Sequence, residues 1–195
     1  MRFEGGSPNA AENAAISTED VRYGSAFGRP DKSLGPRSAI GRSRNYEKAG
    51  PGQMKLVDAN ILVYAVHRQA AQHERIRQWL ESALADEEPI GLAWMVLIAF
   101  LRLTTRPGVF QKPLSADESI ALVDEWLALP NVRLVVESEE HWRYLKESLR
   151  QTGTAGNLTT DAHLAALAIA CGATVVSCDA DFSRFRQLRW ENPLG

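Results

Sequence analysis

From Met54 onward the chain alternates between short apolar runs and longer segments whose apolar residues recur three and four positions apart. The short runs predict buried strands, and the longer segments predict amphipathic or buried helices. Strands that alternate with helices indicate an α/β fold, in which helices flank a mainly parallel sheet. The expected strands are 54–57, 89–92, 132–136, 173–177 and 189–190, and the expected helices are 59–66, 73–84, 93–103, 115–129, 138–151 and 160–171.

Local signals predict where several of these helices begin and end. Ser115, with Glu118 three residues later, is typical of a capping box. Ser138 is the expected serine cap of the next helix, with acids in its first turn. Gly172 is expected to end the last helix, and residues 153–157 are expected to form a loop.

Residues 1–53 differ in composition from the rest of the chain. They are rich in Gly, Ser, Asn, Pro and Arg and have no sustained apolar period, so we expect them to remain disordered. They hold 8 of the 22 basic and 6 of the 24 acidic residues, which leaves residues 54–195 with a net charge of -4. Two origins stay open: a flexible tail that contacts RNA or a partner, or an extension from a start codon placed too early. The second is favoured, because Met54 stands directly before the first expected strand.

Composition excludes several classes of protein. A formal net charge of -2 argues against a protein that coats nucleic acid non-specifically. No apolar stretch is long enough to span a membrane, and the N-terminus lacks the apolar centre of a signal peptide. We therefore expect a cytoplasmic protein without a membrane partner, in which Cys171 and Cys178 are reduced thiols.

Four aspartates are expected where a strand ends or a helix begins. Asp58 follows the first expected strand, Asp161 opens the last expected helix, and Asp179 and Asp181 follow the fourth expected strand. Ligands bind at the carboxyl ends of the strands in such sheets. Carboxylates that converge there repel one another unless a divalent cation lies between them, and Mg²⁺ or Mn²⁺ prefers oxygen ligands. The pattern therefore predicts a metal-dependent active site, and no His/Cys set favours zinc.

Each aspartate also has a simpler interpretation. Asp58 can cap the helix that follows it, with Asn60 orienting its carboxylate or a water. The carboxylate of Asp161 can interact favourably with the dipole at the start of its helix. However, Asp161 shares a packing face with Leu158 and Ala165, and an unpaired carboxylate on such a face is costly.

The segment after the fourth expected strand, which carries Asp179 and Asp181, is compatible with a turn, because Asp is common in turns. If the segment is an extended loop instead, Asp179 and Asp181 point to the same side. His163 follows Asp161 by two positions, so we expect it to point elsewhere on the helix and to have a surface or core role.

Three segments that carry these aspartates resemble a known family in their order and spacing: 55–65, 160–168 and 175–182. Together they resemble the PIN-domain ribonucleases, and within them the VapC toxins of bacterial toxin–antitoxin pairs. The resemblance covers residues 54–195 and implies a PIN-like α/β/α sandwich that cleaves RNA with Mg²⁺ or Mn²⁺.

The resemblance also implies roles for the four aspartates. Carried over by motif, Asp58 and Asp161 are the principal metal ligands. Asp179, together with Asp181, completes the metal set directly or through water. The catalytic residues implied are Asp58, Asp161 and Asp179.

The same resemblance implies partners for the chain. The expected substrate is a tRNA or rRNA loop, the expected inhibitor is a cognate antitoxin that covers the acidic cleft, and the expected assembly is a homodimer. Arg102, Arg106 and Lys112 are candidates to grip the RNA backbone, with Asn60 as a further substrate-binding candidate. Ordinary surface charges are an equally good interpretation of the three cations.

One position departs from the family pattern. Many PIN domains carry a glutamate in the middle of the third helix, whereas Ala99 occupies that place here. Whether the site holds one ion or two therefore stays open, and a catalytically weak RNA-binding or regulatory PIN domain is the alternative function. A Mg²⁺-dependent phosphatase with Asp58 as nucleophile is disfavoured, because that class needs a second Asp where the chain has Asn60.

Overall fold

A computed structural model describes residues 54–153 and 156–195, so the expectations for residues 1–53 lie outside the described residues. The described chain forms a five-stranded sheet in the order β3-β2-β1-β4-β5, in which every neighbouring pair is parallel. The sheet confirms the predicted α/β class. Its strands are β1 (Lys55–Val57), β2 (Ile90–Ala93), β3 (Val132–Val135), β4 (Thr174–Val176) and β5 (Arg189–Glu191).

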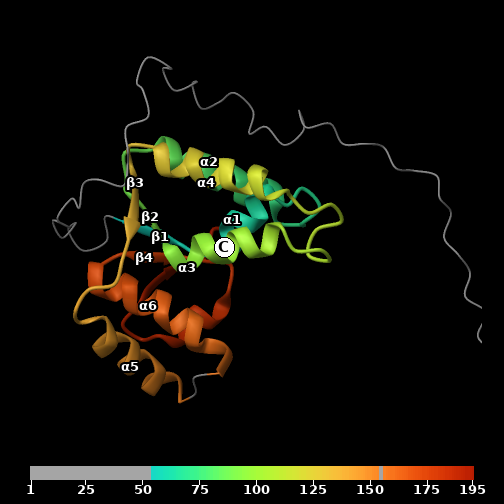
Figure 1. Cartoon of the computed structure of the whole chain (residues 1–195). Helices are drawn as coiled ribbons and strands as arrows, with labels where there is room; N and C mark the ends of the chain where they lie inside the picture. Colours follow the sequence, from blue (N-terminus) through green and yellow to red (C-terminus); the bar gives the residue numbers. More distant parts are fainter. Residues whose placement is uncertain (1–53, 154–155) are drawn as a thin grey trace, which may run out of the picture. The chain divides into compact units, whose positions relative to one another are not determined.

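Helices flank the sheet on both sides. In Figure 1, α2 and α4 lie on one side of the strands and α5 and α6 on the other, which is the expected α/β/α arrangement. Every predicted helix is present in the described residues, with small differences at its ends. The α-helices are α1 (Ala59–Val66), α2 (His73–Ala85), α3 (Trp94–Thr104), α4 (Ala116–Ala128), α5 (His141–Thr152) and α6 (Thr159–Cys171).

The core is built around the two central strands and α6. Leu56 and Val57 of β1 and Val175 and Val176 of β4 are all completely buried, as expected of strands covered on both faces. Helix α6 packs on β4 through a face made largely of alanine. Small side chains let a helix lie close to its neighbour, so the start of α6 is fixed beside the sheet.

Close packing between the strands also requires a glycine at one position of the sheet. A Cβ atom at Gly91, in β2, would lie 2.9 Å from Val135 Cγ2 and 3.0 Å from Leu56 Cδ1. Real Cβ atoms essentially never come within 3.0 Å of another heavy atom, so only glycine fits between β1 and β3 without a shift of a neighbour.

The predicted capping box at the start of α4 is confirmed. The Glu118 backbone N–H donates to Ser115 Oγ at 3.1 Å, and the Ser115 backbone N–H donates to Glu118 Oε2 at 2.7 Å. Gly172 ends α6 in the left-handed conformation with φ 70°, also as predicted.

The predicted start of α5 at Ser138 is wrong. The helix begins at His141, its N-cap Glu140 makes no side-chain capping bond, and its first turn contains no acid. Ser138 belongs to the preceding turn, where its carbonyl accepts from the His141 N–H at 2.9 Å. The turn before α5 contacts α6, because His163 lies 3.3 Å from Glu137 and 3.0 Å from His141.

The loop predicted at 153–157 is also partly wrong. Gly153 ends α5 with φ 68°, but Gly156–Leu158 forms a 3₁₀ helix that leads into α6. Positions 154 and 155 lie outside the described residues.

Cys171 and Cys178 are free thiols, which confirms that no disulfide joins them. Among the helices of the described ranges, none has the length and apolar character needed to cross a membrane.

Candidate active site

The parallel pairing of β1 and β4 determines which residues meet at the carboxyl edge of the sheet. Val57 lies opposite Val176, and the Asp58 N–H donates to the Val176 carbonyl at 3.0 Å. The residues that follow the two strands, Asp58 and Ser177, are therefore neighbours although they lie 119 positions apart in the chain.

Asp58 is held by three hydrogen bonds. Its Oδ1 accepts from the Ala59 N–H at 2.6 Å, and its Oδ2 accepts from Asn60 Nδ2 at 2.7 Å and from the Ser177 hydroxyl at 2.8 Å. Both simpler predictions thus hold, because Asp58 caps α1 and Asn60 orients its carboxylate. Burial raises the pKa of Asp58, the bonds from Ser177 and Ala59 oppose the rise, and the charge of Asp179 adds to it.

Ser177 links Asp58 to the segment that follows β4. Its buried hydroxyl oxygen accepts from Asn60 Nδ2 at 2.8 Å and from the Asp179 N–H at 3.0 Å. The Cys178 N–H donates to Asn60 Oδ1 at 3.2 Å, so both ends of the Asn60 amide are bonded within the protein. A substrate-binding role for Asn60 stays a prediction. Ser177 was not among the residues predicted from the sequence, although a hydroxyl at the end of a buried strand, between two aspartate-bearing turns, is a usable signal.

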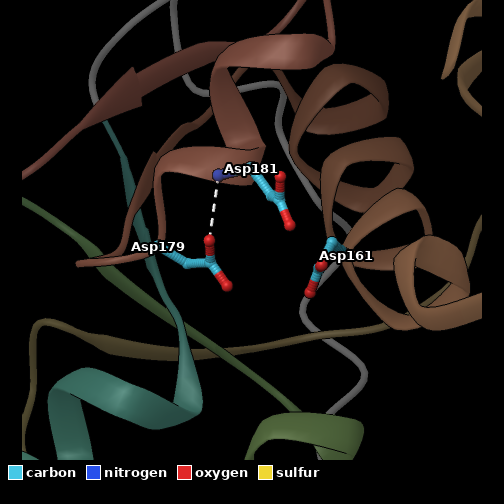
Figure 2. A group of neighbouring side chains, drawn as sticks. All are labelled: Asp161, Asp179 and Asp181. Atoms are coloured by element: carbon cyan, nitrogen blue, oxygen red, sulfur yellow. Dashed lines mark hydrogen bonds between the residues drawn. The ribbon is translucent and has the colours of Figure 1, made fainter.

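Three of the four predicted aspartates converge on one small space. Asp161, Asp179 and Asp181 each offer a carboxylate oxygen, and these oxygens all lie within 4.8 Å of one another. Figure 2 shows Asp161 on its helix facing Asp179 and Asp181 across the gap. We call these three residues the acid cluster. Asp58 lies outside this group of oxygens but is close enough for its charge to act on Asp161.

Of the two interpretations of the segment with Asp179 and Asp181, the turn is confirmed and the extended loop is not. Ala180–Arg184 forms a 3₁₀ helix, η3, and Asp179 caps it by accepting from the Asp181 N–H at 2.9 Å. The cap turns both carboxylates toward Asp161, so the predicted convergence holds for a different geometric reason.

The acid cluster is electrostatically unfavourable without a cation. The pKa of Asp161 is raised to about 6, first by burial and then by the charges of Asp58, Asp179 and Asp181. Oxygen ligands of a Mg²⁺ ion at about 2.1 Å can be at most about 4.2 Å apart, which is close to the spacing here. An all-oxygen set under mutual repulsion fits Mg²⁺ or Mn²⁺. Position 99 of helix α3 is a half-buried alanine, so it contributes no carboxylate to the site.

The three predicted cations lie at the end of α3 and in the segment that follows it. Arg102 lies in the last turn of α3, eight residues after the helix leaves β2, or about 12 Å further along its axis. Arg106 and Lys112 follow in the exposed segment after α3, where the charge of Lys112 acts on Glu118. Their substrate-binding role stays a prediction.

A different arginine lies next to the acid cluster. Arg184 Nη1 is 3.5 Å from Asp181 Oδ1, within the same short helix. Arg184 was not among the residues predicted from the sequence, although the basic run that follows Asp181 was a usable signal. His163, as predicted, has a separate role, because it contacts Glu137 and His141.

Comparisons with known proteins place this geometry in context. Residues 55–188 match the family described as PIN domain. The chain is 44% identical to Ribonuclease VapC37 of Mycobacterium tuberculosis over 140 residues, which cover 72% of this chain and 97% of that protein. It is 40% identical to Ribonuclease VapC33 of the same organism, over 72% of this chain and 99% of that protein.

Two solved structures share the fold at low sequence identity. VapBC2 from Rickettsia felis, bound to a DNA fragment from its promoter, matches with a TM-score of 0.54 and 22% identity, over 71% of this chain and 98% of the other. VapBC-1 from nontypeable Haemophilus influenzae matches with a TM-score of 0.53 and 16% identity, over 73% and 99%. At these identities the structural matches support the fold alone.

Proposed function

We propose that this chain, which belongs to the PIN-domain family and within it to the VapC ribonucleases, is a metal-dependent endoribonuclease that cleaves a tRNA or rRNA and is neutralised by a cognate antitoxin. The observation that carries the proposal is the convergence of Asp161, Asp179 and Asp181 within 4.8 Å, beside a hydrogen-bonded Asp58. Relatives at 40–44% identity are named ribonucleases, which does not favour the catalytically weak alternative.

The acid cluster is the proposed site of Mg²⁺ or Mn²⁺. Asp161, Asp179 and Asp181 hold the ion, and Asp58 completes the set directly or through a water. When bound, a divalent ion would offset negative charge on the scissile phosphate and lower the pKa of a water molecule. Ser177 and Asn60 keep the Asp58 carboxylate in one orientation, so this oxygen does not have to reorganise during the reaction. A single ion is proposed, because Ala99 offers no carboxylate from α3.

The proposed partners follow from membership of the VapC family. A single-stranded loop is the proposed substrate, because side chains can reach bases only where they are unpaired. A homodimer is proposed through α3, where Trp94 and Ile98 lie one turn apart and are 52% and 61% exposed. Side chains this apolar are normally covered when they lie together on a surface.

An RNA-cleavage assay on the full chain tests the function. We expect cleavage of tRNA or rRNA with Mg²⁺ or Mn²⁺, none with EDTA, and a loss of at least about 100-fold in Asp58→Ala and Asp161→Ala. Asp124→Ala, an exposed acid on α4, is the matched control and should cleave normally. Cleavage in EDTA, or full activity in both site variants, would overturn the mechanism.

A further inference from the structure

A short basic segment follows the acid cluster directly. Residues 182–189 contain three arginines and no acid, although residues 54–195 have a net charge of -4. Phe182 and Phe185 of this segment are buried and anchor it to the core. Because a 3₁₀ helix has three residues per turn, these two aromatic residues share one side, and Arg184 is left on the exposed side.

The first arginine stands at the rim of the acid cluster. Arg184 and Asp181 form an ion pair at 3.5 Å, with side chains that are 45% and 49% exposed. Such an exposed pair is weakly held, since water screens both charges. The guanidinium can therefore leave Asp181 and bind a phosphate of an RNA strand at little cost in free energy.

A second contact extends the basic surface to α5. The Arg186 N–H donates to Gln151 Oε1 at 3.3 Å, so the segment after η3 lies against the last turn of α5. Arg150 precedes Gln151 in that turn, and Arg150 and Arg186 are both exposed. Arg189 is not part of this surface, because its guanidinium is bonded to the Gly172 carbonyl.

We propose that Arg184, Arg186 and Arg150 form a phosphate-binding track, which holds the RNA strand beside the acid cluster. The proposal rests on the proposed ribonuclease function and adds a location for its substrate. Clustered carboxylates repel a polyanion, so a strand that reaches them needs cations nearby. The guanidinium group donates two parallel hydrogen bonds to a phosphate, which fixes the strand more firmly than a point charge does.

Two measurements on the full chain test the track. The first is fluorescence anisotropy of a labelled single-stranded RNA of mixed sequence, in EDTA and over a range of KCl concentrations. The second is the KM and kcat of cleavage with Mg²⁺. The variants are Arg150→Gln, Arg184→Gln and Arg186→Gln, singly and together, and the triple substitution to Lys. Arg75→Gln, which removes one exposed charge on α2, is the matched control for each single variant.

We expect the triple Gln variant to bind RNA about tenfold or more weakly, with the slope of log K against log salt reduced by about 2, since each phosphate contact contributes about 0.7. Its KM should rise with little change in kcat. The triple Lys variant should keep the salt slope, and Arg75→Gln should behave as the unaltered protein. A triple Gln variant with unchanged affinity, slope and KM would overturn the track and leave the nuclease standing.

The two proposals can fail separately. A protein that cleaves no RNA, but whose salt slope falls in the triple Gln variant, would overturn the nuclease and support the track. An unaltered protein that binds no RNA in EDTA and cleaves none with Mg²⁺ would overturn both.

Discussion

The Ser177 hydroxyl donates a 2.8 Å hydrogen bond to Asp58 Oδ2, and so joins the carboxyl ends of β4 and β1. The same oxygen accepts from Asn60 and from the Asp179 N–H. Ser177→Ala removes a buried group with three partners, so we expect it to lower the free energy of unfolding by about 1–3 kcal/mol. Its loss should also raise the pKa of Asp58 further, because this bond holds that pKa down.

Urea unfolding measures the loss of stability in Ser177→Ala. Ser183→Ala is the matched control, because its hydroxyl makes only an exposed bond to the Ala180 carbonyl within η3. Equal unfolding free energies for the two variants would show that the link between β1 and β4 contributes no stability.

The raised pKa of Asp161 predicts a pH-dependent change in stability. The carboxyl has a pKa of about 6 in the folded protein, against 3.8 for the ordinary group. The folded state therefore binds the proton more tightly than the unfolded chain, and the stability gained is complete below about pH 4 and lost as the pH rises through about 6. Asp161→Asn should stabilise the protein in EDTA at about pH 7.5, by about 1 kcal/mol after allowance for solvent screening.

Thermal unfolding in EDTA at about pH 7.5 and about pH 4 measures this effect. Near pH 4 Asp161 is protonated in the folded protein and about half protonated in the unfolded chain, so the variant should gain much less there than at about pH 7.5. Asp124→Asn, which neutralises an exposed acid on α4, should change stability equally little at both pH values. A gain in Asp161→Asn that is the same at both pH values would contradict the assigned pKa.

The alternation of apolar runs and helical segments was sufficient to predict the sheet and every α-helix of the described residues, because burial imposes different periods on strands and helices. Contacts between elements could not be predicted in this way. The first residue of α5, His141, contacts His163, which lies on a helix 22 positions further along the chain. Ser138 is a plausible cap by its local sequence, and the local sequence does not show that its neighbours Glu137 and His141 contact α6.

The acid cluster was predicted from strand ends, but its internal order was not. The family resemblance makes Asp58 and Asp161 the principal ligands, whereas the group of oxygens within 4.8 Å contains Asp161, Asp179 and Asp181. The difference arises at the cap of η3, where Asp181 faces Asp161; the sequence allowed a turn here but did not specify the direction of its side chains. The roles of the individual aspartates stay predictions.

The space beside Gly91 predicts the cost of adding one methyl group to the sheet. In Gly91→Ala the new Cβ atom would meet Val135 Cγ2 at 2.9 Å and Leu56 Cδ1 at 3.0 Å. Both neighbours belong to adjacent strands and are buried, so we expect a loss of about 1–3 kcal/mol in the free energy of unfolding. Gly153→Ala, whose Cβ meets nothing within 4 Å but whose φ is 68°, separates crowding from backbone strain. A stable Gly91→Ala variant with an unchanged fold would show that the strands can move apart.

The acid cluster predicts that a divalent ion stabilises the folded protein. Because an ion binds only where the carboxylates are assembled, Mg²⁺ or Mn²⁺ at about 100 times its Kd should add about 2.7 kcal/mol, or about 5–10 °C in Tm. Asp179→Asn and Asp181→Asn should each abolish most of this shift, whereas Asp124→Asn should keep it. The shift should also shrink below about pH 6, because protons then compete with the ion for Asp161. Differential scanning fluorimetry with and without the ion measures all four effects, and a shift that survives both cluster substitutions would place the ion elsewhere.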